Sequence, residues 1–167
     1  SFPTRRSSDL ARALNHGLLL AGMANCGKHF PGHGDTDVDS HLGLPVVAHP
    51  RARLDAVELA PFQGGMAAGA AGVMVAHMEM PAIDPEKRPA TFSPVIIGDL
   101  LRRQLKFDGL IYSDSMKMAA ITKMASPGEA AVLAVKAGID AVLDSPDSAA
   151  AAAAIVSAVK DGTIPRA

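Results

Sequence analysis

Four short predicted strands, each followed by a helix-like segment, constrain the fold of this 167-residue chain more than any other feature. The run 72–77 is apolar without alternation, which is typical of a strand buried on both faces of a parallel sheet. A second buried strand is predicted at 109–114, and shorter ones at 25–30 and 140–143. Strands and helices that alternate in this order imply a parallel sheet with right-handed crossovers. The chain is therefore predicted to be α/β, either an open doubly wound sheet or part of a (βα)8 barrel.

Helix signals fill the segments between the predicted strands. The predicted helices span 14–23, 50–60, 61–68, 93–105, 126–138 and 147–162. Ser93 and Pro94 provide an N-cap and a first helical residue, and Glu129 completes a capping box that begins at Ser126. Gly138 marks a helix end. These signals favour four successive strand-helix units, which could be half of an eight-stranded barrel or an open doubly wound sheet.

Composition excludes several classes of partner. The net charge is −1, and no basic stripe with interleaved aromatic residues is present, which argues against nucleic acid as a partner. The single cysteine, Cys26, excludes an internal disulfide framework. No apolar run reaches the roughly 18 residues that a membrane-spanning helix needs. One globular domain, or part of a larger one, remains, and its oligomeric state is left open.

The first ten residues, SFPTRRSSDL, show neither a helical nor a strand period. They resemble the conceptual translation of a common sequencing-adapter oligonucleotide. We therefore expect residues 1–10 to be a non-native segment, and 11–167 to be a fragment of a longer protein. A missing secretion signal carries no information in such a fragment, so the compartment, cytoplasmic or exported, is left open.

The segment 28–41 is unusually dense in titratable side chains. It contains three histidines and three aspartates, and its glycines and proline indicate a loop that meets a ligand. Imidazole and carboxylate groups suit zinc, iron or manganese, but the spacing fits no standard zinc pattern. The Asp-x-Asp-x-Asp run resembles the start of a calcium loop, yet Ser40 and Val46 stand where glycine and glutamate are required. No metal site is predicted, although a metal-dependent barrel hydrolase stays an alternative; its ligands would be His29, His33, His41 and Asp114.

Polar side chains stand at the ends of three predicted strands: His29, His77 and Asp114. Ligands of βα folds bind at the carboxyl ends of the strands. Asp114 could be a nucleophile, a metal ligand or a helix N-cap, and His77 could equally be a satisfied core histidine. In the loop, Asp39 could orient His41 for proton transfer, or the two could form a structural hydrogen bond.

At these residues the chain resembles the β-N-acetylhexosaminidase branch of the family 3 glycoside hydrolases. The resemblance rests on the motif Lys28-His29-Phe30-Pro31-Gly32-His33-Gly34 with Asp39-Ser40-His41, and continues through Val75-Ala76-His77-Met78, Pro89-Ala90-Thr91 and Gly109-Leu110-Ile111-Tyr112-Ser113-Asp114-Ser115-Met116. It implies a partial TIM (βα)8 barrel, made of about the last four βα units. Ser115 departs from the pattern, because the family often has Asp or Ala there.

The resemblance also implies an activity: removal of terminal β-linked N-acetylglucosamine with retention of configuration. Asp114 would be the nucleophile, His41 the general acid/base and Asp39 its partner. The substrate-binding residues would be Lys28, His29, His77 and Met116. Bacterial members act on muropeptides in cell-wall recycling, and no cofactor is implied.

Two further expectations follow from the resemblance. A broader β-glucosidase is a second alternative, although family 3 β-glucosidases generally lack the Asp-x-His pair formed here by Asp39 and His41. The first four barrel strands are expected to be absent, together with an Asp and an Arg that grip the sugar. The isolated fragment is therefore expected to be inactive.

Overall fold

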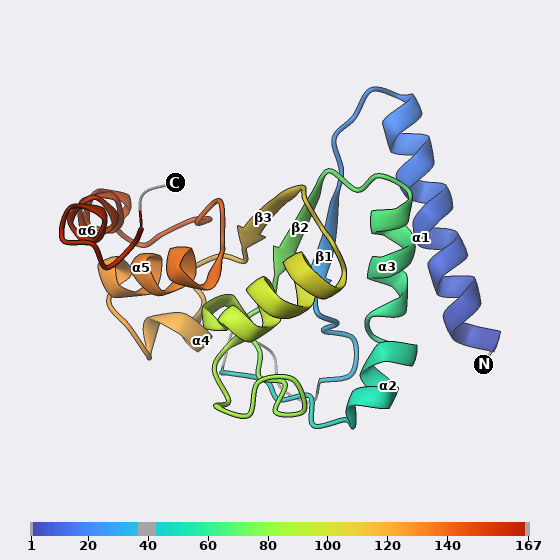
Figure 1. Ribbon diagram of the computed structural model, residues 1–167, viewed down its shortest axis with the longest axis horizontal. Coiled ribbons are helices and arrows are strands. Elements are labelled where there is room, and N and C mark those ends of the chain that lie inside the picture. Colours follow the sequence, from blue (N-terminus) through green and yellow to red (C-terminus); the bar gives the residue numbers. More distant parts are fainter. Residues whose placement is uncertain (1, 37–42, 166–167) are drawn as a thin grey trace.

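The computed structural model describes residues 2–36 and 43–165, and the side chains from residue 6 onward. Its centre is a parallel sheet in the order β1-β2-β3, formed by β1 (Cys26–Phe30), β2 (Gly72–Val75) and β3 (Leu110–Ser113) (Figure 1). Gly72 of β2 pairs with Cys26 on one side and with Leu110 on the other. The parallel arrangement brings the carboxyl ends of all three strands to one edge, as the alternating pattern predicts.

The fourth predicted strand, 140–143, is present only as an isolated parallel bridge between Tyr112 and Ala141. The Ser113 amide donates to the Ala141 carbonyl at 3.0 Å, which continues the sheet by one residue. Beyond it, the Leu143 amide turns to the Ser113 hydroxyl at 2.8 Å and not to a backbone carbonyl. This side-chain bond replaces the next rung of the ladder, so the segment follows β3 without forming a regular strand.

Helices surround the sheet. They are α1 (Phe2–Leu20), α2 (Arg51–Ala56), α3 (Ala60–Ala67), the 3-10 helix η1 (Ala90–Phe92), the π-helix η2 (Val95–Gln104), α4 (Ala119–Thr122), α5 (Pro127–Ala137) and α6 (Ser148–Lys160). α1 and α3 lie side by side on one flank of the sheet, and α5 and α6 lie together on the other (Figure 1).

The predicted capping signals operate in the structure. Ser126 and Glu129 form the full capping box of α5, and Gly138 ends that helix with φ 109°. The Ser93 hydroxyl accepts the Ile96 amide at 3.0 Å at the start of η2. Pro61 lies in the first turn of α3, where its missing amide hydrogen costs no helical bond. These local signals were therefore sufficient to predict where α3, η2 and α5 begin.

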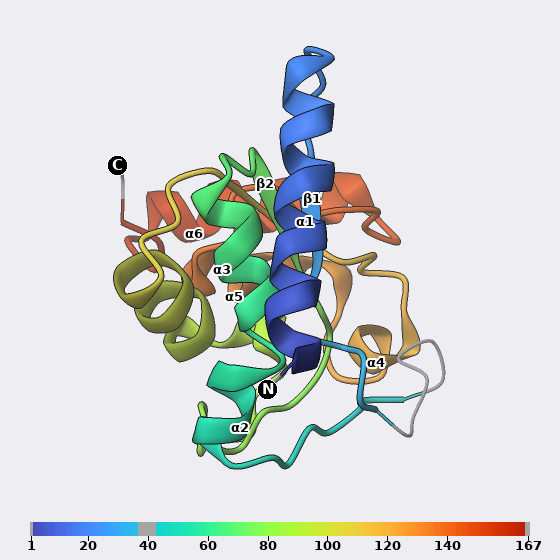
Figure 2. The same cartoon turned by 90° about the vertical axis from the view of Figure 1, so that its right-hand side faces the viewer.

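Helix α1 is longer than the sequence pattern indicates. It begins at Phe2, so residues 2–10, which show no helical period in the sequence, form its first half. The Ser8 hydroxyl donates to the Ala60 carbonyl at 2.9 Å, and the Asn15 amide donates to the Ala68 carbonyl at 2.8 Å. These two contacts join α1 to α3, and the two helices lie side by side in Figure 2. This segment lacks an amphipathic period, and its helical conformation is accompanied instead by tertiary contacts with α3.

The core fills the space between the sheet and the helices, and β1 contributes to it with Phe30. Its ring is fully buried and meets Phe62 of α3 edge-on, with 5.2 Å between the ring centroids. Ile96, Ile97, Leu100 and Leu101 of η2 are buried as well. Within the described part of the chain, no helix combines the length and the apolar character needed to cross a bilayer.

Candidate active site

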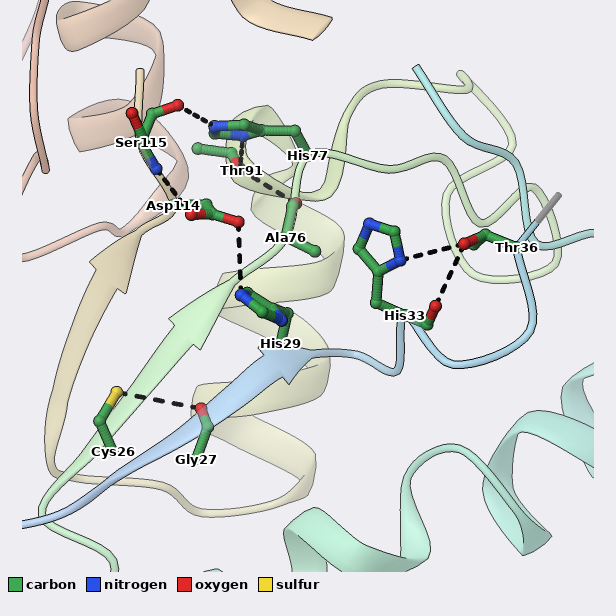
Figure 3. A network of polar contacts seen from close by, with 10 residues as sticks. All are labelled: Cys26, Gly27, His29, His33, Thr36, Ala76, His77, Thr91, Asp114 and Ser115. Carbon is green, nitrogen blue, oxygen red and sulfur yellow. Dashed lines mark hydrogen bonds and ion pairs between the residues drawn. The ribbon is translucent and has the colours of Figure 1, made fainter. Parts of the chain in front are cut away.

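Three predicted site residues meet where the strands end. His29 is the penultimate residue of β1, and Asp114 directly follows β3. Their side chains point toward each other across the end of β2, with 3.6 Å between His29 Nε2 and Asp114 Oδ2 (Figure 3). His77, two residues beyond β2, lies on the far side of Asp114. The edge of the sheet thus assembles residues that are up to 85 positions apart (114 − 29).

The two carboxylate oxygens of Asp114 have different surroundings. Oδ1 accepts the Ser115 amide at 2.8 Å, and Oδ2 faces His29. Helix α4 begins only at Ala119 with Met118 as its N-cap, so Asp114 does not cap it. The side chain keeps 17% of its exposure. One oxygen is therefore held by the backbone while the other stays directed at the site.

The surroundings of the His29 ring favour its neutral form. Burial lowers its pKa, and the nearby Lys28 and His33 lower it further, while the Asp114 charge acts in the opposite direction. Lys28 precedes it on β1 and is exposed. The peptide bonds Lys28–His29 and Phe30–Pro31 are cis. A half-buried imidazole of this kind can donate to or accept from a neutral hydroxyl group.

The loop after β1 is closed by its own polar side chains. The Thr36 hydroxyl lies 3.0 Å from His33 Nδ1 and also contacts the His33 carbonyl at 3.2 Å. Asp35 Oδ2 lies 2.6 Å from His49 Nε2 and accepts from Arg53 at 3.3 Å. These contacts give His33 and Asp35 structural roles in the loop.

An open hollow of about 1350 Å³ adjoins the strand ends. Its polar wall includes Lys28, His29, His33, Asp114 and Ser115. Its apolar wall includes Leu14, Leu18, Phe62, Met66 and Val73. The polar wall offers hydrogen-bond donors and acceptors that could serve the hydroxyl groups of a ligand.

His77 and Met116, both expected at the substrate site, are buried with exposed fractions of 0% and 2%. Neither lines the hollow. Both ring nitrogens of His77 are already in hydrogen bonds, to Thr91 and to the Ser115 carbonyl. In this structure His77 therefore contacts the backbone of Ser115, next to Asp114, which agrees with the core-histidine interpretation.

The expected proton-transfer residues Asp39 and His41 lie outside the described residues. Their roles stay predictions.

A metal centre built on His29, His33 and Asp114 does not assemble among the residues that the structure describes. The three potential ligands that come together there are Asp35, His49 and Glu58, with their ligating atoms within 4.8 Å of one another. Arg53 already lies between two of these carboxylates, 3.3 Å from Asp35 and 3.0 Å from Glu58. The guanidinium occupies the place that a cation would need and supplies the compensating positive charge.

Comparison with known families settles the relationship. The profile of the Glycosyl hydrolase family 3 N terminal domain matches residues 3–167. The chain belongs to glycosyl hydrolase family 3. It is 41% identical over 159 residues to a beta-hexosaminidase of Neisseria gonorrhoeae, covering 93% of this chain and 42% of that protein. It is 42% identical over 136 residues to a beta-hexosaminidase of Nitrosospira multiformis, covering 81% and 38%. The family 3 chain thus spans about two-fifths of these relatives' length.

Solved structures agree with this assignment. A family 3 beta-N-acetylglucosaminidase from Paenibacillus sp. str. FPU-7 superposes with a TM-score of 0.92 at 46% identity, over 95% of this chain and 31% of that one. The beta-N-acetylglucosaminidase from Thermotoga maritima gives 0.79 at 35% identity, over 89% and 32%. The predicted α/β fold and its place as part of a barrel are confirmed.

The sequence reasoning missed Asp144 as a residue near the site. Its carboxylate accepts the Ser115 hydroxyl at 2.8 Å and pairs with Lys117 at 2.6 Å, contacts that lower its pKa. Asp144 directly follows the predicted strand 140–143, as Asp114 directly follows the observed strand β3. The same strand-end rule could have found it.

Proposed function

We propose that this chain carries the nucleophile and part of the sugar-binding site of a retaining glycoside hydrolase that removes terminal β-linked N-acetylglucosamine. The observation that carries the proposal is Asp114 Oδ2, which faces His29 at the hollow while Oδ1 is held by Ser115. Support comes from the relatives, which are named beta-hexosaminidases and beta-N-acetylglucosaminidases. Peptidoglycan-type glycosides of cell-wall recycling are the proposed natural substrates.

The reaction would take two steps. Asp114 Oδ2 attacks the anomeric carbon, and the bond to the leaving oxygen breaks while His41 gives that oxygen a proton. His41 then takes a proton from water, whose oxygen attacks the anomeric carbon and releases Asp114 as carboxylate. Asp39 would orient the imidazole and stabilise its charged form. Lys28 and His29, which line the hollow, would hold sugar hydroxyls.

The test needs the part of the barrel that the relatives have and this chain does not span. We would replace the matching 159 residues of the Neisseria gonorrhoeae relative by this chain. The chimera is expected to hydrolyse an aryl N-acetylglucosaminide, and Asp114→Ala to abolish turnover. A slow fluorinated glycoside should label Asp114, as mass spectrometry would show. A folded chimera without turnover, or one that keeps activity after Asp114→Ala, would contradict the proposal.

Two controls separate the alternatives. A metal-dependent hydrolase would lose activity after chelation, whereas the proposed glycosidase keeps it. A broader β-glucosidase would turn over the aryl glucoside as well as the N-acetylglucosaminide. The 167-residue chain alone is expected to be inactive, and measurable turnover by its monomer would contradict that expectation.

A further inference from the structure

His77 is a fully buried polar side chain placed directly behind the proposed nucleophile. Its exposed fraction is 0%. Nδ1 lies 2.7 Å from the Thr91 hydroxyl, and Nε2 lies 3.0 Å from the Ser115 carbonyl oxygen (Figure 3). The Thr91 hydroxyl also lies 3.1 Å from the Ala76 carbonyl. Every polar atom of the ring thus has a specific partner.

These partners determine where the ring carries its proton. The Ser115 carbonyl can only accept, so Nε2 must donate. The Thr91 hydroxyl has one hydrogen, which it can give to Nδ1 or to the Ala76 carbonyl. If it went to Ala76, Nδ1 would also be protonated and His77 would be a buried cation. Burial lowers the pKa of His77, although the Ser115 carbonyl and the Asp114 charge oppose that shift. The neutral ring with hydrogen on Nε2 is therefore favoured, and Thr91 donates to Nδ1.

Ser115, whose carbonyl accepts from His77, also contacts Asp114 through its amide. The Ser115 amide donates to Asp114 Oδ1 at 2.8 Å, and the Ser115 hydroxyl donates to Asp144 at 2.8 Å. Ser115 is therefore fixed through its amide, its hydroxyl and its carbonyl. A shift of this residue would rotate the Asp114 carboxylate and turn Oδ2 away from the hollow.

We propose that Thr91 and His77 form a positioning pair that fixes the Ser115 backbone and, through it, the attack direction of Asp114 Oδ2. Neither residue of the pair lines the hollow. It acts on the first reaction step by keeping the nucleophile in line, where small misplacements can cost up to about 100-fold in rate. This role deepens the proposed function and rests on it.

The first experiment tests the network in this chain without requiring activity. Nitrogen-15 NMR of the histidine-labelled 167-residue protein reports the protonation state of His77, which His77→Gln assigns by loss of its signals. At neutral pH we expect a neutral ring with hydrogen on Nε2. A ring with hydrogen on Nδ1 alone, whose Nε2 could not donate to the Ser115 carbonyl, would overturn the proposal.

The second experiment measures turnover in the chimera described above. Thr91→Val keeps the shape and removes the hydroxyl, and is expected to lower kcat about 10- to 100-fold with KM changed less than about 2-fold. Thr91→Ser keeps the hydroxyl and is expected to restore kcat to near the unsubstituted value. Circular dichroism melts show the folded fraction of each variant.

The outcomes distinguish this inference from the proposed function. If Asp114→Ala abolishes turnover while Thr91→Val leaves kcat unchanged, the positioning pair is refuted and the proposed function stands. The same conclusion follows if Thr91→Ser, folded, loses as much kcat as Thr91→Val. If Asp114→Ala leaves turnover intact, the proposed function fails. The NMR result is then the remaining test of the contacts among Thr91, His77 and Ser115.

Discussion

At the scale of single residues, one position near the site has a backbone conformation that most amino acids rarely adopt. Gly32, in the loop after β1, has φ +130°, a region that side-chain-bearing residues rarely adopt. A Cβ at this position would lie 2.7 Å from Glu58 Cβ, too close for any real contact. The glycine in the loop motif is therefore required both by backbone conformation and by space.

We expect Gly32→Ala to lower the free energy of unfolding by about 1–3 kcal/mol, because it adds both strain and overlap. Gly34→Ala is the matched control, since a Cβ there meets nothing within 4 Å. It should leave stability unchanged or raise it by up to about 1 kcal/mol. Urea denaturation followed by circular dichroism measures both. Equal effects of the two substitutions would contradict the argument.

The buried histidines predict a pH dependence of stability. Burial lowers the pKa of His77 and of His29, so each ring takes up a proton on unfolding once the pH is below about 6.5. Stability from these groups is present above that pH and is lost as the pH falls from about 7 toward 5.

We expect the free energy of unfolding to decrease over this range, by at most about 1.4 kcal/mol per pH unit for each proton. His77→Gln should reduce the slope and leave the part due to His29. Urea titrations at a series of pH values provide the measurement. A His77→Gln protein with an unchanged slope would show that the His77 proton is not taken up on unfolding.

At the scale of elements, one arginine joins three segments at the amino end of the sheet, away from the site. Arg102 of η2 donates to the Phe107 carbonyl at 2.9 Å, to the Gly109 carbonyl at 2.7 Å and to Asp140 at 2.6 Å. The same Asp140 oxygen accepts the Ile111 amide of β3 at 2.7 Å. This network holds the segment after α5 against β3, where regular strand pairing is reduced to one bridge.

Arg102→Lys should therefore lower stability by about 1–3 kcal/mol, because an ammonium cannot reproduce the planar fork that serves three acceptors. Arg103→Lys is the control at the neighbouring position: that side chain is 73% exposed and is paired with Asp99, one turn earlier on the helix. Its replacement should change stability by less than about 0.5 kcal/mol. Thermal melts of both variants test the contrast, and similar losses would contradict it.

At the scale of the whole molecule, the described part of the chain leaves the β1 edge of the sheet unpaired. In the described part, the sheet order gives β1 a partner only in β2. The hollow beside it is lined on one wall by apolar side chains of α1 and α3. Leu14 of α1 lines that hollow and is 68% exposed. Unpaired strand edges and contiguous apolar surface both favour association.

We expect the 167-residue protein to self-associate as its concentration rises, in size-exclusion chromatography with light scattering. Leu14→Glu should shift the distribution toward monomer. Val156→Glu is the control, because Val156 is 52% exposed on α6, on the opposite flank of the sheet (Figure 1). A monomer at every concentration, or equal effects of the two substitutions, would refute this expectation.

Local patterns in the chain already determined much of this protein. The apolar runs predicted β2 and β3 to within about two residues, and Ser126, Glu129 and Gly138 predicted the ends of α5, because strand burial and helix capping depend on neighbouring residues. The strand-end rule brought His29 and Asp114 to one edge.

What each side chain does there was decided only by the tertiary structure. His77 meets Thr91 and Ser115 across 14 and 38 residues, and Asp114 directs one oxygen to His29 across the sheet. Such contacts depend on how the strands are placed side by side, and no local period or spacing encodes them.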